Sequence, residues 1–496
     1  MRTRKASGPG QYRPVRAPWW LCALPLLMAG CAQLPDWQGK AALEPAAPNA
    51  LLATPTAQTT DWPQAQWWQR YGNPQLDDLI AEALQGAPDM QAAAARVQQA
   101  QAMLGLSQST TAPQLSANAN VKGDKLSYNH LTPASMTPRG MQDYGRATLD
   151  LSWSLDLWGK HRSAIAAAQG ELQARQADAA QARLVLASGI ASAYADLVRL
   201  SANEQTLLQS TALRAKTAQL FQERFDNGLE NLGSVHSAKA RLAGAQAELV
   251  QVQEQLGLQR NRMAALIGAS PERGAQITVP TNALQQPWQQ QWALPEHLPM
   301  NLLGRRPDVV AARLQAQALE SRAASKEAEF YPDINLSALV GVQSLGIDML
   351  AKGGSSIASV GPAISLPIFN GGRLRSQLAA TRAQYDEAVA LYRSTLNRAL
   401  QEVADNAVSQ RALQQQLQAM QDAVQAATEA HRVARNRYEG GLANYLEVLS
   451  AEDQLLANVR QLVEVQSRAL SLDIGLHRAL GGGWQQAAAS HGEAAH

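Results

Sequence analysis

The sequence predicts an α+β membrane protein in which a unit of strands and long helices occurs twice along the chain. Three observations support this prediction. Several motifs recur in the same order in the two halves, two long stretches contain no proline, and four short segments alternate apolar and polar side chains. Ala and Gln dominate the proline-free stretches and favour helix, and such small or polar side chains suit long helices that pack beside water.

The charge balance argues against a protein that binds nucleic acid. The 496 residues include 43 Lys and Arg against 41 Asp and Glu, which leaves a formal net charge of only +2. Proteins that bind nucleic acid normally concentrate positive charge to meet the phosphates. We therefore expect no nucleic-acid partner for this chain.

The first 30 residues have the pattern of a bacterial export signal. Basic residues precede a short apolar run, Ala17–Ala29, and small residues follow it directly before Cys31. The run is too short to span a bilayer, which takes about 20 apolar residues in a helix. We expect residues 1–30 to be removed, and the remaining chain offers no unbroken apolar run of that length.

The end of this signal resembles a bacterial lipobox, in which a cysteine becomes the lipid-modified first residue. The matching residues are Leu27–Cys31. The resemblance implies that Cys31 carries palmitate or related acyl chains, and Ala32 implies transfer to the outer membrane. An ordinary signal peptide with an incidental cysteine is the alternative. Because Cys22 leaves with the signal, the mature chain cannot form an internal disulfide. Residues 31–73 are expected to form a lipid-anchored extended segment.

Three motifs occur twice in the same order, which indicates a tandem duplication. The pairs are Pro-Asp at Pro88 and Pro307, SLDLWGKHR from Ser154 with SLPIFNGGR from Ser365, and RFDNGL from Arg224 with RYEGGL from Arg437. We expect each repeat to contain a helix, two strands and a long helical hairpin. The expected bounds are 74–285 for the first repeat, 286–482 for the second and 483–496 for a disordered tail.

Four segments alternate with the period of a β-strand: residues 114–122, 146–156, 333–342 and 356–366. In the second segment, Leu149, Leu151 and Trp153 alternate with polar residues, so one face is apolar. Each segment has about the 9–11 residues that a tilted strand needs to cross a membrane. The period alone fits a soluble sheet equally well. A membrane sheet would have to close into a barrel with other copies, because hydrocarbon cannot satisfy edge amides.

Two very long helices are predicted by the absence of proline from Arg162 to Phe225 and from Arg373 to Tyr438. At ~1.5 Å per residue, each would be roughly 90 Å long. Apolar residues recur at three-to-four spacing in the second stretch, which is typical of a coiled coil. Each long helix is expected to end at a glycine-containing turn, and second helices at 234–266 and 445–480 would return beside them.

Motifs for catalysis or cofactor binding are absent from the sequence. The chain contains no GxxxxGK[ST], HExxH, GxSxG or paired CxxC motif. Its helices hold histidines at no common ligand spacing, which we interpret as residues on solvated helix faces: His161, His236, His431 and His477. We therefore expect neither an enzyme nor a metal or cofactor site.

The ordered motifs resemble those of the TolC-like outer-membrane factors, in particular the NodT-like lipoprotein branch. Further matching residues are WPQAQWWQRYGNPQLDDLI from Trp62 and RRPD from Arg305. The resemblance covers essentially all of the mature chain. It implies a homotrimer whose twelve strands, four per chain, form one outer-membrane β-barrel continuous with a long periplasmic α-helical barrel. Trp62, Trp67 and Trp68 are expected to be packing residues.

The resemblance also implies the function of a channel. Members of the family passively conduct drugs or other small toxic compounds from an inner-membrane transporter and a periplasmic adaptor, the membrane fusion protein, to the exterior. Two alternatives stay open for this chain. It could be the outlet of a type I system for secreting polypeptides, or a lipid-anchored periplasmic scaffold without a pore.

Two groups of site residues follow from the resemblance. Contacts with the adaptor are implied at the two hairpin turns, Gly228-Leu229 and Gly441-Leu442. A periplasmic gate is implied at Glu447 and Ser450, beside Arg437 and Tyr438, where Arg437 would pair with a neighbouring carboxylate. The alternative is that the glycines only allow tight turns and that Glu447 is a solvated charge.

Overall fold

The computed structural model describes residues 35–37, 39–43, 63–127, 129, 135–279 and 305–486. Cys31 and Trp62 lie outside the described residues. The chain divides into two compact units, and the boundary between them passes through long helices. The first unit comprises Met1–Lys40, Leu106–Ala167 and Leu319–Tyr385, and the second comprises Ala41–Gly105, Ala168–Ala318 and Asp386–His496.

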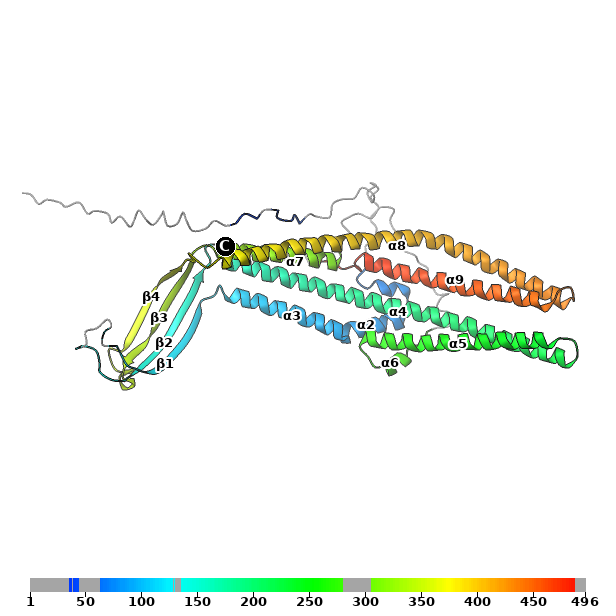
Figure 1. Ribbon diagram of the computed structural model, residues 1–496, viewed down its shortest axis with the longest axis horizontal. Coiled ribbons are helices and arrows are strands. Elements are labelled where there is room, and N and C mark those ends of the chain that lie inside the picture. The colour runs from blue at the N-terminus through cyan, green and yellow to red at the C-terminus, as the bar shows by residue number, and fades with distance from the viewer. Residues whose placement is uncertain are drawn as a thin grey trace, which may run out of the picture. The chain divides into compact units, whose positions relative to one another are not determined.

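The first unit contains a four-stranded antiparallel sheet in the order β1-β2-β3-β4 (Figure 1). The strands are β1 Gln114–Asp124, β2 Gln142–Leu155, β3 Asp333–Leu345 and β4 Ser356–Ser365. They occupy the four segments that alternate in the sequence. Within the described residues, β1 and β4 are edge strands with one neighbour each.

Residues near the N-terminus pack on α8 within the first unit. The Trp37 ring lies edge-on to Tyr385 with centroids 5.1 Å apart, and the Arg382 guanidinium lies 5.2 Å from the Trp37 ring. Arg382 Nη1 also donates to the carbonyl of Pro35 at 2.6 Å. These contacts fix the chain shortly after the expected anchor at Cys31.

The helices have the lengths that the proline-free stretches predict. Helices α4 and α8 have 67 residues each, so each is roughly 100 Å long at ~1.5 Å per residue. The helices are α2 Pro74–Gly86, α3 Pro88–Ser109, α4 Lys160–Asp226, α5 Leu232–Ile267, α6 Pro271–Ala275, α7 Pro307–Ala328, α8 Arg373–Glu439 and α9 Tyr445–Ala479, with short 3-10 helices η2 Trp67–Tyr71 and η5 Ile347–Met349.

Within the second unit, α5 returns along α4 and α9 returns along α8, which forms two helical hairpins (Figure 1). The largest core cluster lies where α2 and η2 pack on α4, α5 and α9. It contains Trp67, Trp68 and Tyr71, so the expected packing role of the two described tryptophans is confirmed. The expected extended conformation was wrong for Trp67–Tyr71, because these aromatic side chains are buried by forming a short helix.

His477 does not lie on a solvated helix face. Its side chain is buried, and its ring stacks on Trp67 with centroids 5.0 Å apart. Arg70 Nη1 lies 3.1 Å from His477 Nε2, and Tyr71 donates to Asp473 at 2.6 Å on the preceding turn of α9. Burial and the positive charge of Arg70 lower the pKa of His477 to about 3, so the ring is neutral at physiological pH.

Residues 483–486, which were expected to belong to a disordered tail, are folded. After α9 the chain turns through Gly481, Gly482 and Gly483, all with positive φ. Trp484 then packs against a small cluster of α4 and α7 side chains. Residues 483–486 therefore belong to the folded unit. The Trp484 ring packs on a surface that the local sequence pattern did not indicate.

One helix of the described residues, α4, contains a stretch long and apolar enough to cross a membrane. Of that stretch, 67% is buried inside the protein. Burial of this extent is also what the central helix of a helical bundle shows, so the stretch by itself is weak evidence of a membrane span.

Because His477 is buried in its neutral form, we expect the stability of the fold to decrease at acidic pH. The pKa of His477 is lower in the folded state than the ~6.5 of an unfolded chain. The neutral ring therefore makes its full contribution to the free energy of unfolding above pH 6.5, and this contribution is lost as the pH falls toward 3. At pH 5 the loss is about 2 kcal/mol. Between pH 7 and pH 5 the melting temperature should fall more in the wild type than in His477→Phe.

The matched control is His236→Phe, because His236 is exposed. This variant should keep the full pH dependence of the wild type. An equal fall in melting temperature for wild type and His477→Phe would contradict the assignment of the acid sensitivity to His477.

Candidate functional site

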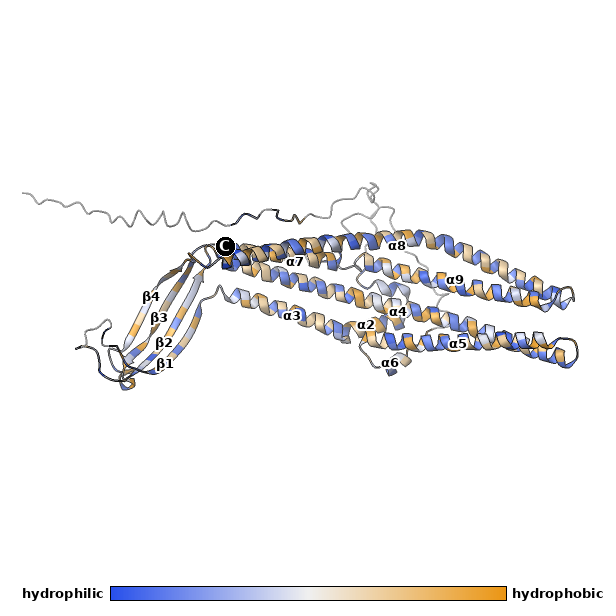
Figure 2. Ribbon diagram, viewed as in Figure 1, coloured by the Kyte–Doolittle hydropathy of each residue, from blue (hydrophilic) through white to orange (hydrophobic). Residues whose placement is uncertain are grey.

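One face of the sheet is continuously apolar across all four strands. The strand register places Leu115 opposite Leu151, and Leu149 opposite Val340. The same alternation appears as bands of hydrophobic and hydrophilic residues along β1 to β4 in Figure 2. Several of these side chains are widely exposed, as Leu115 is at 68%. A broad exposed apolar face of this kind needs a lipid or protein partner.

The opposite face is polar and hydrogen-bonded between strands. Asp150 accepts from Asn118 at 2.9 Å and from Thr148 at 2.8 Å. One strand further, Asn335 donates to Ser152 at 2.9 Å. The bonds of Asn118 and Asn335 tie neighbouring strands through the polar face, whereas the Thr148 bond lies within β2.

The two hairpin turns have nearly the same geometry, as the repeat predicts. Gly228 and Gly441 have φ of +69° and +72°, a left-handed conformation that favours glycine. The following amides, of Leu229 and Leu442, each donate at 2.8 Å to a carbonyl in the last turn of the preceding helix. The structural role of both glycines is therefore clear. Leu229 and Leu442 are 68% and 75% exposed at the tips.

Asparagine caps explain where the returning helices begin. Asn231 Oδ1 accepts from the amide of Ser234 at 2.9 Å, and Asn444 Oδ1 accepts from that of Glu447 at 3.1 Å. Such caps satisfy an amide that has no partner inside the helix. The capping residues occur at equivalent places in the two repeats, three residues after Gly228 and Gly441, so the sequence itself contains this N-cap signal.

The structure brings the expected gate residues together at the second turn. Arg437 Nη1 donates to Glu447 Oε2 at 3.2 Å, and both side chains are about half exposed, at 53% and 46%. Arg437 therefore pairs with a carboxylate, as expected, and the pair joins α8 to α9 within one hairpin. Ser450 is exposed one turn further along α9, and the Tyr438 ring lies 4.9 Å from that of Tyr445.

Tyr445 is a tip residue that sequence reasoning missed. It begins α9, but its side chain packs on the other hairpin, where its hydroxyl lies 3.1 Å from Thr217 Oγ1 on α4. The ring contacts Phe221 edge-on with centroids 4.7 Å apart. The two hairpins are therefore joined near their tips through an aromatic side chain, and a tyrosine after a turn gave no signal of this in the sequence.

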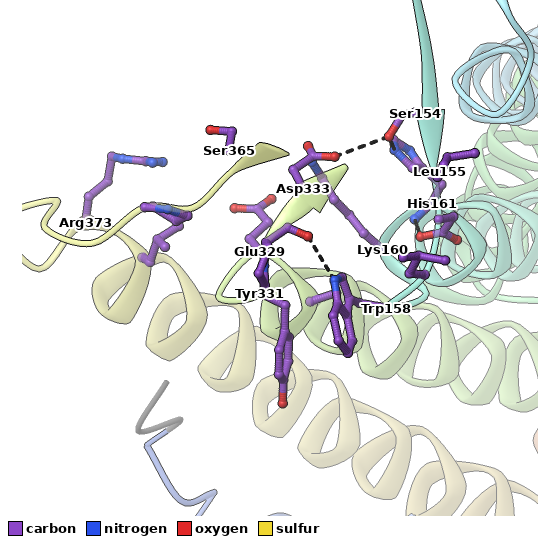
Figure 3. A pocket seen from close by; sticks show the side chains of 16 residues that line it. Ser154, Leu155, Trp158, Lys160, His161, Glu329, Tyr331, Asp333, Ser365 and Arg373 are labelled. Atoms are coloured by element: carbon purple, nitrogen blue, oxygen red, sulfur yellow. Dashed lines mark hydrogen bonds and ion pairs between the residues drawn. The ribbon is translucent and has the colours of Figure 1, made fainter. Parts of the chain in front are cut away.

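A cavity of about 220 Å³ lies where strands become helices in the first unit (Figure 3). Two charged residues of its lining are paired, since Lys160 Nζ lies 3.2 Å from Asp333 Oδ2. Trp158 stacks on Tyr331 with centroids 5.0 Å apart and donates to the Pro332 carbonyl at 2.8 Å. The residues come from both repeats, so the cavity joins the two strand-to-helix junctions.

The N-terminus of α4 beside this cavity is capped by Asp156. Its carboxylate accepts from the amides of His161 and Arg162 at 3.1 and 2.8 Å. Partial burial opposes ionisation, but these two donors hold the pKa of Asp156 below its ordinary value. No cluster of three or more His, Cys, Asp or Glu suited to a metal occurs in the described parts of the chain.

The sequence profile of the outer membrane efflux protein family matches residues 79–269 and 298–482, one segment in each repeat. The multidrug resistance outer membrane protein MdtP of Escherichia coli K12 is 32% identical over 434 residues, which cover 86% of this chain and 88% of MdtP. This chain belongs to the outer membrane efflux protein family.

Two further relatives agree with that assignment. The fusaric acid resistance protein FusA of Burkholderia cepacia is 36% identical over 73% of this chain and 68% of FusA. The crystal structure of the outer membrane protein VceC of Vibrio cholerae is 44% identical, covers 86% of this chain and 100% of VceC, and gives a TM-score of 0.79.

Membership of the efflux protein family assigns the parts of the chain. The protein is an outer-membrane channel component of an efflux system, with its strands in the outer membrane and its helical hairpins in the periplasm. The apolar face of the sheet is therefore the side that meets lipid, and the hydrogen-bonded polar face is the wet side. The interpretation of the sheet as a soluble one is excluded.

We expect a lysine to destabilise the protein on the apolar face of the sheet but not on the polar face. Leu151→Lys places an ammonium group in hydrocarbon and should cost roughly 2–4 kcal/mol if it lies near the membrane midplane. Ser152→Lys, on the adjacent residue and the polar face, should be tolerated. The measurement is the folded fraction in lipid vesicles as a function of urea concentration, and equal destabilisation by the two variants would contradict the assigned faces.

Proposed function

We propose that three copies of this chain close into one twelve-stranded barrel and passively conduct small toxic compounds outward. The observation that carries this proposal is the sheet with two free edges. β1 and β4 each have one neighbour within the described chain. In a bilayer the unpaired backbone groups of an edge cost several kcal/mol each, so β1 of one copy has to pair with β4 of another.

Drugs are the substrate class that the relatives favour. MdtP is named for multidrug resistance and FusA for resistance to fusaric acid. Both names describe resistance to small molecules, which favours drug efflux over secretion of polypeptides and over a scaffold without a pore. The polar face of the sheet gives such molecules a water-lined passage.

A periplasmic adaptor and an inner-membrane transporter are the proposed partners. The hairpin tips present leucines that a water-exposed turn does not need. Leu229 and Leu442 are equivalent in the two repeats, and Leu232 and Leu446 lie beside them; each of the four is more than half exposed. Two apolar tips per chain form a docking surface for the helices of an adaptor. The transporter supplies the energy, and the chain itself has neither a catalytic role nor a cofactor.

The periplasmic gate lies at the second tip. Glu447 and Ser450 face the constriction, and Arg437 and Tyr438 hold the turn beside it. The ion pair between Arg437 and Glu447 supports a closed resting state, because it joins the helices on both sides of the turn. The pair is half exposed and therefore weak enough to break when an adaptor binds.

Cys31 is the proposed lipid anchor. Pro35 is held by Arg382, nine positions after the start of α8 at Arg373. Four residues reach at most about 14 Å in extended chain, and nine helical residues rise about 14 Å. The acylated residue can therefore reach the level at which β4 leaves the membrane and α8 begins.

The function is tested at the tips. Leu229→Asp combined with Leu442→Asp should leave a folded trimer with unchanged conductance in planar bilayers, yet abolish drug efflux and crosslinking to the adaptor in cells. The physical reason is that a carboxylate in each apolar contact is desolvated without a partner. The control is Leu258→Asp, which changes a leucine of α5 that is 60% exposed away from the turns.

The control variant should retain both efflux and crosslinking. Normal efflux in the double tip variant would exclude the turns as the docking site. Absence of conductance in the wild-type trimer would instead favour the scaffold and would contradict the channel itself.

The anchor has its own test. Cys31→Ser should abolish incorporation of labelled palmitate, whereas Cys22→Ser should retain it, because Cys22 leaves with the signal peptide. The protein should stay in the outer membrane, since each acyl methylene adds only ~0.8 kcal/mol and the barrel anchors the chain independently. Labelling that persists in Cys31→Ser would show that the acylated residue lies elsewhere.

A further inference from the structure

Two short segments lead from the membrane strands into the long helices. Residues 156–162 join β2 to the first turn of α4, and residues 366–375 join β4 to the first turn of α8. We call these segments the two junctions. Both belong to the first unit, and they contain the paired LDLWGKHR and LPIFNGGR motifs. Because the strands lie in the outer membrane and the helical hairpins in the periplasm, the junctions lie where the periplasmic leaflet of the membrane meets water.

Each junction exposes two large apolar side chains at equivalent positions. Leu157 and Trp158 are 59% and 50% exposed in the first junction, and Ile368 and Phe369 are 82% and 92% exposed in the second. Leu157 follows Leu155 at the spacing of the lipid-facing residues of β2, so the apolar side chains continue past the end of the strand. Exposed apolar groups that continue a membrane-facing surface indicate contact with lipid at its edge.

The Trp158 side chain is fixed in place although half of it is exposed. Its ring stacks on Tyr331, and its Nε1 donates to the carbonyl of Pro332 (Figure 3). These contacts come from the other repeat and leave one part of the ring free for a partner. A ring held in this way presents a defined apolar surface, which costs little conformational entropy when a lipid binds.

Basic side chains begin both long helices, where the helix itself disfavours them. The first turn of α4 contains Lys160 and Arg162, and the first turn of α8 contains Arg373 and Arg375. Neither first turn contains an acidic residue. The start of a helix is the positive end of its dipole, so cations destabilise it there. Helices α3 and α7 have the favourable pattern, with an aspartate in the first turn. The reversed pattern in α4 and α8 therefore indicates a negative partner outside the helices.

The chain neutralises only part of this positive charge. The two junctions contain four basic side chains and one acidic side chain, Asp156. The Asp156 carboxylate is 14% exposed and accepts from amides of α4, whereas the Arg162 side chain beside it is 74% exposed. Lys160 is paired with an aspartate of β3. Arg373, the equivalent of Arg162 in the second repeat, donates to the neutral side chain of Gln377 at 3.1 Å. Each junction therefore presents an exposed arginine to an external anion.

We propose that the two junctions bind anionic phospholipids of the periplasmic leaflet, with the headgroup phosphate at Arg162 and Arg373 and the acyl chains against Leu157 and Ile368. In each junction the order along the chain is strand, apolar pair, arginine and helix. A phospholipid has the same order from acyl chain to headgroup to water. Guanidinium groups match phosphate oxygens in a bidentate geometry. Lipid binding of this kind is independent of what the channel conducts.

Native mass spectrometry of the full-length protein in detergent measures lipid binding directly. Phosphatidylglycerol and phosphatidylcholine with the same acyl chains are titrated separately, and the wild type should bind phosphatidylglycerol more tightly. Arg162→Gln combined with Arg373→Gln should weaken binding of phosphatidylglycerol roughly 30-fold, about fivefold for each arginine. Phosphatidylcholine should be affected much less, because its choline charge offsets the phosphate. The variant should fold normally, since it removes cations from the positive ends of two helices.

Two further variants separate the parts of the site. Arg432→Gln combined with Arg435→Gln is the matched control, because it removes two arginines that are more than half exposed near the opposite end of α8. It should keep the preference for phosphatidylglycerol. Leu157→Ser combined with Ile368→Ser should weaken binding of both lipids to a similar extent, because the two lipids have the same acyl chains.

Three results would overturn the lipid site. The first is a wild-type protein that binds the two lipids equally well. The second is an equal loss of phosphatidylglycerol binding in the two double arginine variants, because the preference would then follow the total charge of the protein. The third is dissociation of the copies of the chain in Leu157→Ser combined with Ile368→Ser, with unchanged lipid affinity, because these side chains would then contact another copy.

Discussion

Hydrogen bonding at the free edges of the sheet is the constraint on which the rest of this structure depends. The four strands of one chain pair with one another in register, but β1 and β4 have backbone groups that only a further strand can satisfy. In hydrocarbon no water replaces that partner. The apolar face and the free edges therefore make sense together only in an assembly of several chains.

The helical unit is subject to a different constraint. It lies in water, and its two long hairpins must pack against each other. Small alanines allow the helices to approach closely, and a small apolar cluster around Phe221 and Val235 packs near the tips. Polar contacts also join the two hairpins in this region. Tyr445, Asp453 and Glu452 all reach from α9 to the other hairpin. The aromatic core around Trp67 is instead held by apolar packing.

Particular residues show which parts of the structure were accessible from the sequence. The strands were predictable because alternation at Leu149, Leu151 and Trp153 is a local pattern, and the long helices were predictable because proline is absent from them. The motif RRPD from Arg305 predicted the start of a helix, but it did not predict the contacts of its second arginine, Arg306. Arg306 is buried and bonds to Glu402 at 2.9 Å and to the carbonyl of Ala479 at 3.1 Å. His477 was likewise assigned to a solvated face, yet it stacks on Trp67 in the core.

The sequence alone determined the duplication, the two helical hairpins, the amphipathic strands and the family, because each of these is recorded in short-range period or in motif order. Only the tertiary structure decided which helix faces meet. It buried His477 and Glu452, placed Tyr445 on the opposite hairpin, and put Asp453 between two arginines more than 200 positions earlier in the chain. The physical reason is that helical periodicity fixes the face on which a side chain lies, whereas its partner depends on how distant helices pack.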